Sequence, residues 1–218
     1  MRAAWLSAFA MALTACASAP AAPAPMRLPD AGSELGALRP DAASLSDRIT
    51  VNTERYSFDS VEPDALLAEM RNSAQSAGIA MLGRTDWNVS WTYDYAQDAG
   101  QCAAENVQTS LTVDYVLPDW QPRSRPSDAL RQRYAVFSAA VEVHEYGHAL
   151  IGYRAMQDIQ LALSTSAVRH TDCARVGKAL NAKARDIIAR ASREGDAYDR
   201  DTGHGKTQGA FLDLGGLE

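Results

Sequence analysis

The sequence lacks several features that mark large classes of protein. It has only three cysteines and four histidines among its 218 residues, and it contains no internal repeat. The formal net charge is -6 and basic residues do not cluster, which excludes the basic surface that nucleic-acid binding requires. After the first fifteen residues, no apolar run is long enough to cross a bilayer. These absences favour a single domain with its own core and no nucleic-acid partner.

The first fifteen residues have the pattern of a secretory signal, because Arg2 is followed by a short apolar stretch. Residues 13–16 read Leu-Thr-Ala-Cys, which resembles the bacterial lipobox, where the signal is cut before the cysteine and the sulfur is lipidated. We therefore expect Cys16 to anchor the protein to a membrane. An ordinary signal cut near Ala19 or Ala22, which would discard Cys16, is the alternative.

The segment that follows is predicted to be a tether. Residues 16–46 are rich in Ala, Pro, Gly and Ser and have little hydrophobic periodicity, which is typical of a flexible linker. Ala17 after the cysteine resembles the pattern of lipoproteins that are not retained in the inner membrane. The predicted location is therefore the cell envelope, as an outer-membrane lipoprotein that faces the periplasm, with the folded domain in residues 47–218.

The most specific motif is His-Glu-Tyr-Gly-His at residues 144–148, inside a helical pattern over residues 127–163. Residues four apart on a helix share a face, so His144 and His148 can bind one Zn²⁺ with Glu145 beside its open side. The same face carries the apolar residues Phe137, Ala140, Val141, Ile151, Gly152 and Ala155, so the histidines should face inward. The opposite face, with Glu142, Tyr146 and Asp158, is expected to be solvated or partly covered.

Catalytic zinc needs a third protein ligand and an open position. The residues after His148 lack the nearby histidine of metzincins, so this ligand must be distant in the sequence. We favour His204, because glycines on both sides indicate a tight turn that presents its imidazole. The alternatives are the carboxylates of Glu194, Asp199 and Asp201, and, with less support, His170, which precedes a helix start and suits a cap.

With zinc in place, Glu145 is the expected general base, which takes a proton from the attacking water and passes it to the leaving amine. Two further residues are candidates for supporting roles. Tyr198 has a hydroxyl that suits an oxyanion donor, and Asp199 could orient a ligand imidazole through its free N–H. A structural role is the simpler interpretation of Tyr198.

Alternating residues with one phase shift predict a first strand, or a bent pair of strands, over 49–58, and a helix follows from Pro63 to the break at Gly78. Residues 87–95 and 107–115 alternate strongly and predict two adjacent antiparallel strands, with their aromatic residues on one packed face. The second of these strands would either accept an extended peptide by strand addition or lie inside the sheet.

Three prolines, at 118, 122 and 126, predict a rigid crossing before Ser127 caps the motif helix. A second long helix should begin after Thr171 or Asp172 and end near Gly195. In an oxidising compartment Cys102 and Cys173 are expected to form a disulfide, which would stabilise the fold by roughly 4 kcal/mol. Cysteine ligation of zinc is the minor alternative.

Several of these pieces occur in an order that resembles the bacterial secreted proteins of domain of unknown function 922 (DUF922), which are predicted zinc-dependent proteases of the HEXXH type. The resemblance covers roughly residues 56–209. Its pieces are the strand at Tyr56 leading to Leu66, the strand from Trp87 to Tyr93, Cys102, Leu117-Pro118-Asp119-Trp120, the motif at 144–148, Cys173, Tyr198-Asp199 and Thr202-Gly203-His204-Gly205. The resemblance implies a metallopeptidase-like fold with His144 and His148 as ligands, Glu145 as the catalytic residue and the His204 region completing the site.

Together these inferences predict an α+β protein with a zincin-like domain, in which a small antiparallel sheet packs against the long motif helix and a second long helix. We expect a lipid-anchored metallopeptidase that hydrolyses a peptide or protein substrate in the cell envelope. One alternative is a non-catalytic binding or assembly lipoprotein with a structural metal. Another is a metal-dependent amidase that acts on cell-wall peptides.

Overall fold

A computed structural model describes residues 27–30, 33, 35–40 and 48–216, so the predicted signal, Cys16 and much of the predicted tether lie outside the described residues. The chain forms three strands, three α-helices and two short 3-10 helices in this part. In order they are η1 (Leu35–Leu38), β1 (Ile49–Phe58), α1 (Pro63–Ser76), β2 (Arg84–Asp98), β3 (Gln101–Trp120), α2 (Asp128–Ser164), α3 (Cys173–Thr202) and η2 (Lys206–Gln208). None of the described helices combines the length and the hydropathy that a membrane span needs.

The sheet is mixed, with strand order β1-β3-β2. The predicted antiparallel pairing of β2 with β3 is confirmed, with Asp98 opposite Gln101 at the turn. The expectation of a purely antiparallel sheet is wrong, because β1 pairs with β3 in parallel from Ile49 opposite Leu111 to Phe58 opposite Trp120. Alternation of side chains marks a strand without specifying its partner, and the connection through α1 and β2 allows β1 to reach the far side of β3.

The central strand is longer than predicted. The rigid crossing expected from Pro118 begins only after Trp120, because Pro118 lies within β3 opposite Tyr56 of β1. On the other side, β2 begins opposite Val116, so the missing N–H of Pro118 interrupts no ladder there. From Leu111 to Val116 this strand has a partner on both sides, so this part of it is interior and is not a docking edge for a peptide.

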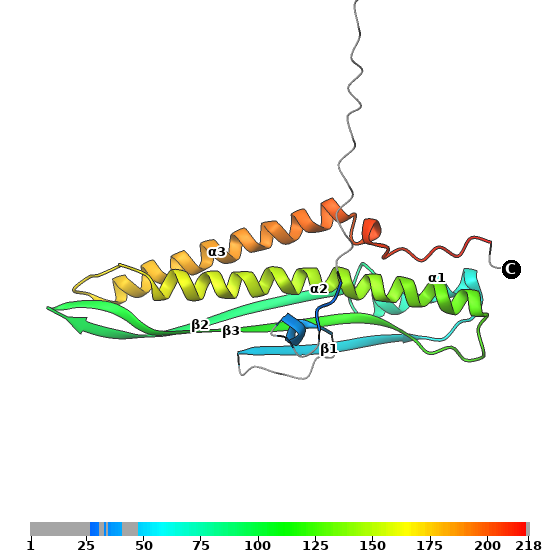
Figure 1. Ribbon diagram of the computed structural model, residues 1–218, viewed down its shortest axis with the longest axis horizontal. Coiled ribbons are helices and arrows are strands. Elements are labelled where there is room, and N and C mark those ends of the chain that lie inside the picture. Colours follow the sequence, from blue (N-terminus) through cyan, green and yellow to red (C-terminus); the bar gives the residue numbers. More distant parts are fainter. Residues whose placement is uncertain (1–26, 31–32, 34, 41–47, 217–218) are drawn as a thin grey trace, which may run out of the picture.

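The two long helices lie antiparallel along one side of the sheet (Figure 1). Ser127 caps α2 as predicted, since its hydroxyl accepts the backbone N–H of Leu130 at 3.2 Å. Asp172 caps α3 in the same way, with its carboxylate accepting the N–H of Ala174 at 2.9 Å. The aromatic face of β2 packs on α3, where the indole N–H of Trp91 donates to Asn181 at 2.9 Å. These contacts confirm the aromatic ladder as a packed face.

The end of α3 differs from the prediction and matters for the site. Gly195 does not end the helix, which continues to Thr202 and stops at Gly203 in a left-handed conformation with φ 59°. A single glycine costs a helix only about 1 kcal/mol, which packing against α2 can offset. Tyr198 and Asp199 therefore lie on a rigid helix and not in a loop.

The back of α2 is covered by the N-terminal segment. Tyr146, expected on a solvated or partly covered face, is only 1% exposed, and its hydroxyl donates to the carbonyl of Leu35 at 3.2 Å. Leu38 is fully buried, and its carbonyl accepts the hydroxyl of Tyr115. Part of the predicted tether therefore packs against the domain. Its composition masked this, because its few large apolar residues, such as Leu35 and Leu38, are separated by Ala, Pro, Gly and Ser.

The predicted disulfide between Cys102 and Cys173 is confirmed. It joins the start of β3 to the first turn of α3, and the backbone of Cys102 also pairs with that of His170. The link therefore closes the end of the helix pair where α2 passes into α3.

Candidate metal centre

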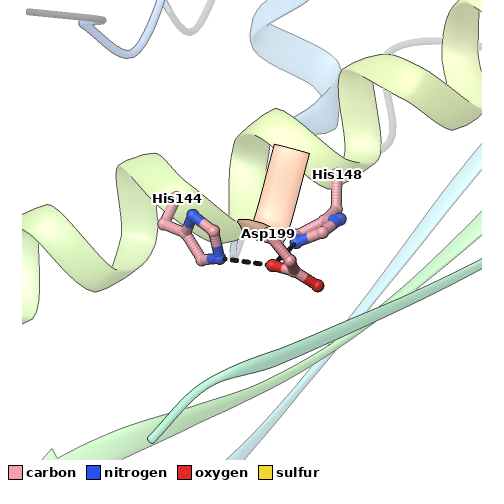
Figure 2. Close-up of side chains that lie close together, drawn as sticks. All are labelled: His144, His148 and Asp199. Atoms are coloured by element: carbon pink, nitrogen blue, oxygen red, sulfur yellow. Dashed lines mark hydrogen bonds and ion pairs between the residues drawn. The ribbon is translucent and has the colours of Figure 1, made fainter. Parts of the chain in front are cut away.

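His144 and His148 lie one turn apart on α2 and face Asp199, which comes from α3 (Figure 2). The Nε2 atoms of the two imidazoles are 3.1 Å and 3.0 Å from the same carboxylate oxygen, Oδ1 of Asp199. The side chains of His144 and His148 are mostly buried, and that of Asp199 is 30% exposed. The prediction that both histidines face inward is confirmed.

These three residues form the group within the described part of the chain whose ligand atoms converge, all lying within 4.8 Å of one another. Ligand atoms around a tetrahedral zinc are about 3.3 Å apart, given zinc–ligand distances near 2 Å. The two nitrogen–oxygen distances are close to this value. Two imidazole nitrogens and a carboxylate oxygen are also a donor set that zinc accepts, so the residues present fit the metal.

His204, the favoured third ligand, lies beside this group and is not a member of it. Its Nδ1 is 3.6 Å from Oδ1 of Asp199, and its side chain is 52% exposed. It occupies the expected tight turn, with φ 53° between Gly203 and Gly205. Because α3 continues past Gly195, the helix brings Asp199 over α2 and leaves His204 at the mouth of the site.

The other proposed ligands lie elsewhere. Glu194 pairs with Arg154 at 3.1 Å on the surface, and Asp201 is exposed. His170 accepts the backbone N–H of Asp172 through Nδ1 at 2.8 Å, which is the capping role proposed for it. Of the carboxylate alternatives, only Asp199 is brought to the two histidines.

Glu145 is 4% exposed, and its side chain extends from α2 to the start of β2. The hydroxyl of Thr85 donates to its Oε2 at 2.8 Å, while a Cβ at Gly83 would lie 2.6 Å from its Oε1, so glycine leaves the space that this oxygen occupies. Burial raises the pKa of Glu145 from 4.5 to about 7; the charges of Asp199 and Asp86 add to this, and the hydrogen bond from Thr85 opposes it. The carboxyl is therefore suited to exchange a proton near neutral pH.

Tyr198 packs flat against His144, with ring centroids 4.9 Å apart and ring planes 12° apart. Its hydroxyl donates to the backbone carbonyl of His144 at 3.2 Å, so it is directed at α2 and does not line the cavity next to Glu145. The Nδ1 atom of His144 lies 2.9 Å from Oε1 of Gln208. Burial lowers the pKa of His144, and the charge of His148 acts in the same direction, while Gln208 and Asp199 oppose both effects.

Sequence reasoning missed Thr85, Gly83 and Gln208. Gly83 precedes β2 and Thr85 is its second residue, so both lie before the alternating residues 87–95 from which the strand was predicted. Nothing in their local sequence distinguishes a site residue from a surface residue. Gln208 belongs to no motif. Its position four residues after His204, beyond a glycine-flanked turn that reverses the chain, is the one signal that could have indicated it.

Two cavities meet at the metal group. The first, of about 250 Å³, is lined by Met81, Leu82, Gly83, Arg84, Thr85, Val141, His144, Glu145, His148, Asp199, His204 and Ala210. The second, of about 410 Å³, is lined by Thr85, Asp86, Trp87, His148, Ile188, Ala191, Ser192, Gly195, Asp196 and Asp199. Thr85, His148 and Asp199 line both, so a groove follows the start of β2 on either side of the metal group. The lining of the first cavity combines apolar side chains with ionisable ones, and that of the second includes the three aspartates Asp86, Asp196 and Asp199.

Residues 53–205 match the model of a family described as "Bacterial protein of unknown function (DUF922)". This match contains Glu145, both histidines of the motif, Asp199 and His204, and it ends before Gln208. Searches of curated proteins and of solved structures found no significant match to the chain.

Proposed function

Because the chain belongs to the DUF922 family, whose function is unknown, we propose an activity from its own site: zinc-dependent hydrolysis of peptide bonds. The observation that carries this proposal is the convergence of His144, His148 and Asp199 beside a buried carboxyl, Glu145, in an open cavity. These residues supply three ligands and a general base, which is what hydrolysis by a catalytic zinc requires.

In this proposal His144, His148 and Asp199 would hold the metal. When bound, zinc lowers the pKa of water and polarises a carbonyl, which is the chemistry that a peptide bond needs. Asp199 takes the place favoured for His204 because its Oδ1 already contacts both imidazoles. His204 remains at the rim of the cavity, where its imidazole can reach a bound substrate.

Glu145 would take a proton from the attacking water and deliver it to the leaving amine. Thr85 holds Oε2 by donating to it, which leaves Oε1, next to Gly83, as the oxygen free for proton transfer. The same carboxyl is buried, so its interaction with a nearby proton donor is not weakened by bulk water.

The substrate is proposed to bind along β2. This strand forms an edge of the sheet, and within the described residues its outer side pairs with no other strand. Residues 81–87 line the two cavities on both sides of the metal group. An extended peptide added to this edge would place a peptide bond next to Glu145 and have a cavity for side chains on either side.

We also propose that the protein acts in the cell envelope, attached through Cys16. The disulfide between Cys102 and Cys173 supports an oxidising compartment. Mass analysis of membrane-extracted protein should find acyl groups on Cys16, and a mature chain beginning after this residue would contradict the anchor.

The test of the activity compares the protein with its Glu145→Gln variant after loading with zinc. Glutamine keeps the shape of the side chain but cannot accept the proton, so hydrolysis should fall by about 10²- to 10⁴-fold while zinc content stays at one per chain. Casein-type peptides and purified cell-wall material should be assayed side by side. New amines from the wall material alone would replace the peptidase with an amidase, and an envelope phenotype that survives Glu145→Gln would favour the non-catalytic alternative.

A further inference from the structure

The imidazole of His144 belongs to a set of hydrogen bonds that the imidazole of His148 does not make. Nδ1 of His144 lies 2.9 Å from Oε1 of Gln208, and the amide nitrogen of Gln208 donates to the hydroxyl of Tyr198 at 3.0 Å. That hydroxyl donates in turn to the carbonyl of His144 at 3.2 Å. The three side chains therefore form a closed ring with the backbone of α2.

The direction of the hydrogen bonds in this ring follows from the amide of Gln208, whose NH₂ group only donates and whose oxygen only accepts. The Tyr198 hydroxyl can give its single proton to the carbonyl of His144 at 3.2 Å or to Oε1 of Gln208 at 3.3 Å. In either case the hydroxyl oxygen is free to accept, and it faces the NH₂ group of Gln208. This places the amide oxygen of Gln208 against Nδ1 of His144. Because an amide oxygen cannot donate, Nδ1 must carry the proton.

A neutral imidazole carries one proton, so a proton on Nδ1 leaves a lone pair on Nε2. This lone pair points at Oδ1 of Asp199, 3.1 Å away, which is also an acceptor. Two acceptors at this distance repel each other unless a proton or a metal ion lies between them. We propose that Gln208 and Tyr198 are positioning residues that fix His144 in the Nδ1–H tautomer and thereby keep its Nε2 lone pair available to a metal ion.

The use of the lone pair for catalytic zinc rests on the proposed function, whereas the tautomer itself does not. Two features of the chain fit this arrangement. A Cβ at Gly147 would lie 2.2 Å from the hydroxyl of Tyr198, so the glycine inside the motif makes room for the ring of hydrogen bonds. The turn after α3 brings Gln208 back to α2, with left-handed backbone at Gly203, His204 and Gly205.

The other histidines provide references within the same molecule. His170 accepts a backbone N–H through Nδ1 at 2.8 Å, so it must carry its proton on Nε2, the opposite tautomer. His148 makes its one side-chain hydrogen bond among the described residues through Nε2, to Asp199. Its tautomer is therefore free to follow Asp199, and only His144 should respond to changes at Gln208.

The experiment is nitrogen-15 NMR of the imidazoles in the metal-free protein at pH 8, where histidines of ordinary pKa are neutral. We expect His144 as the Nδ1–H tautomer and His170 as the Nε2–H tautomer. Gln208→Met keeps the length of the side chain but removes the acceptor, so His144 should shift toward the Nε2–H form, which donates to Asp199. His170 should not change. An Nε2–H tautomer of His144 in the wild-type protein would overturn the proposal.

Zinc affinity, measured by competition with a chelator, gives the second readout. Gln208→Met should weaken zinc binding by about 10- to 100-fold, as is typical for removal of a partner that orients a ligand histidine. Gln208→Glu restores an acceptor for Nδ1–H and should recover most of both the affinity and the tautomer, which a packing defect would not allow. Equal zinc affinity of wild type and Gln208→Met would contradict the role. Absence of peptidase activity with the tautomers as expected would count against the proposed function alone.

Discussion

The two ends of the α2–α3 helix pair are joined by different chemistry. At one end the disulfide between Cys102 and Cys173 ties α3 to the sheet, and the indole of Trp91 bonds to Asn181 nearby. At the other end Asp199 of α3 meets His144 and His148 of α2 through polar side chains. Covalent and aromatic contacts suit stability, whereas a partly exposed polar cluster suits ligand binding. The comparison teaches that stability and metal binding should respond to different substitutions.

The largest effect on stability is expected at the disulfide end. Replacing Cys102 and Cys173 together by serine opens a loop with a sequence separation of 71 residues and should lower the free energy of unfolding by about 4 kcal/mol. Denaturant unfolding measures this change. Zinc affinity of the folded protein should change little, since the site lies at the opposite end of the helix pair. A loss of zinc binding as large as that from removing a ligand would show that the two ends are not independent.

The counterpart at the site end is Asp199→Ala. A structural zinc site with four ligands binds with about 10–16 kcal/mol, so loss of one ligand should weaken zinc binding by about 10²- to 10³-fold. The matched control is His204→Ala, which changes a neighbour outside the converging group and should leave zinc content at one per chain. Unfolding of the metal-free Asp199→Ala protein should be close to that of wild type. If His204→Ala loses zinc and Asp199→Ala retains it, the ligand assignment is reversed.

The buried carboxyl at the site end should make stability depend on pH. The pKa of Glu145 is about 7 when folded and near 4.5 when unfolded, so the folded state binds more protons between these values. Stability from this group is therefore present at low pH and is lost as pH rises through 7. The measured quantity is the unfolding free energy of metal-free Glu145→Gln minus that of metal-free wild type. This difference should rise in favour of the variant by up to about 3 kcal/mol between pH 4 and a pH above 7.

The pKa of His144 is lowered by burial, so its own contribution has the opposite sign and is lost as pH falls below its ordinary value of 6.5. Wild type and Glu145→Gln share this contribution, so it cancels in the difference between their unfolding free energies. Denaturant unfolding at several pH values, with a chelator present, measures the difference directly. A difference that does not vary with pH would mean that Glu145 is not desolvated.

The smallest effect is expected at the back of α2, away from both ends of the comparison. Tyr146→Phe removes the hydrogen bond to the carbonyl of Leu35 and leaves the ring packed, which should cost about 1 kcal/mol of unfolding free energy. Hydrogen exchange should show faster opening of residues 35–38 in this variant. Unchanged exchange and stability would mean that the N-terminal segment is held by the burial of Leu38 and not by the hydrogen bond.

Local patterns predicted the helices and strands well, because periodicity and capping act within a few residues. Ser127 was predicted as a cap from its own chemistry, and the motif predicted that His144 and His148 share a face. Relations between distant segments were less accessible. The parallel partner of β1, the cover over Tyr146 and the choice of Asp199 over His204 all depend on how whole elements pack.

The proposed third ligand shows this limit most clearly. Gly195 predicted a helix end, and the loop expected after it would have presented His204. The helix continues because its interior packing offsets the cost of one glycine, so α3 presents one residue per turn to α2 and that residue is Asp199. Gln208 could not be found in advance, since its role depends on a turn that returns the chain to His144.

Zinc titration of the metal-stripped protein, with the bound ion then located by anomalous X-ray diffraction, tests the metal centre most directly. We predict one zinc per chain, with Nε2 of His144, Nε2 of His148 and a carboxylate oxygen of Asp199 as its protein ligands and Glu145 beside it without binding it. Failure to take up zinc, or an ion bound without the two histidines, would contradict the proposed site.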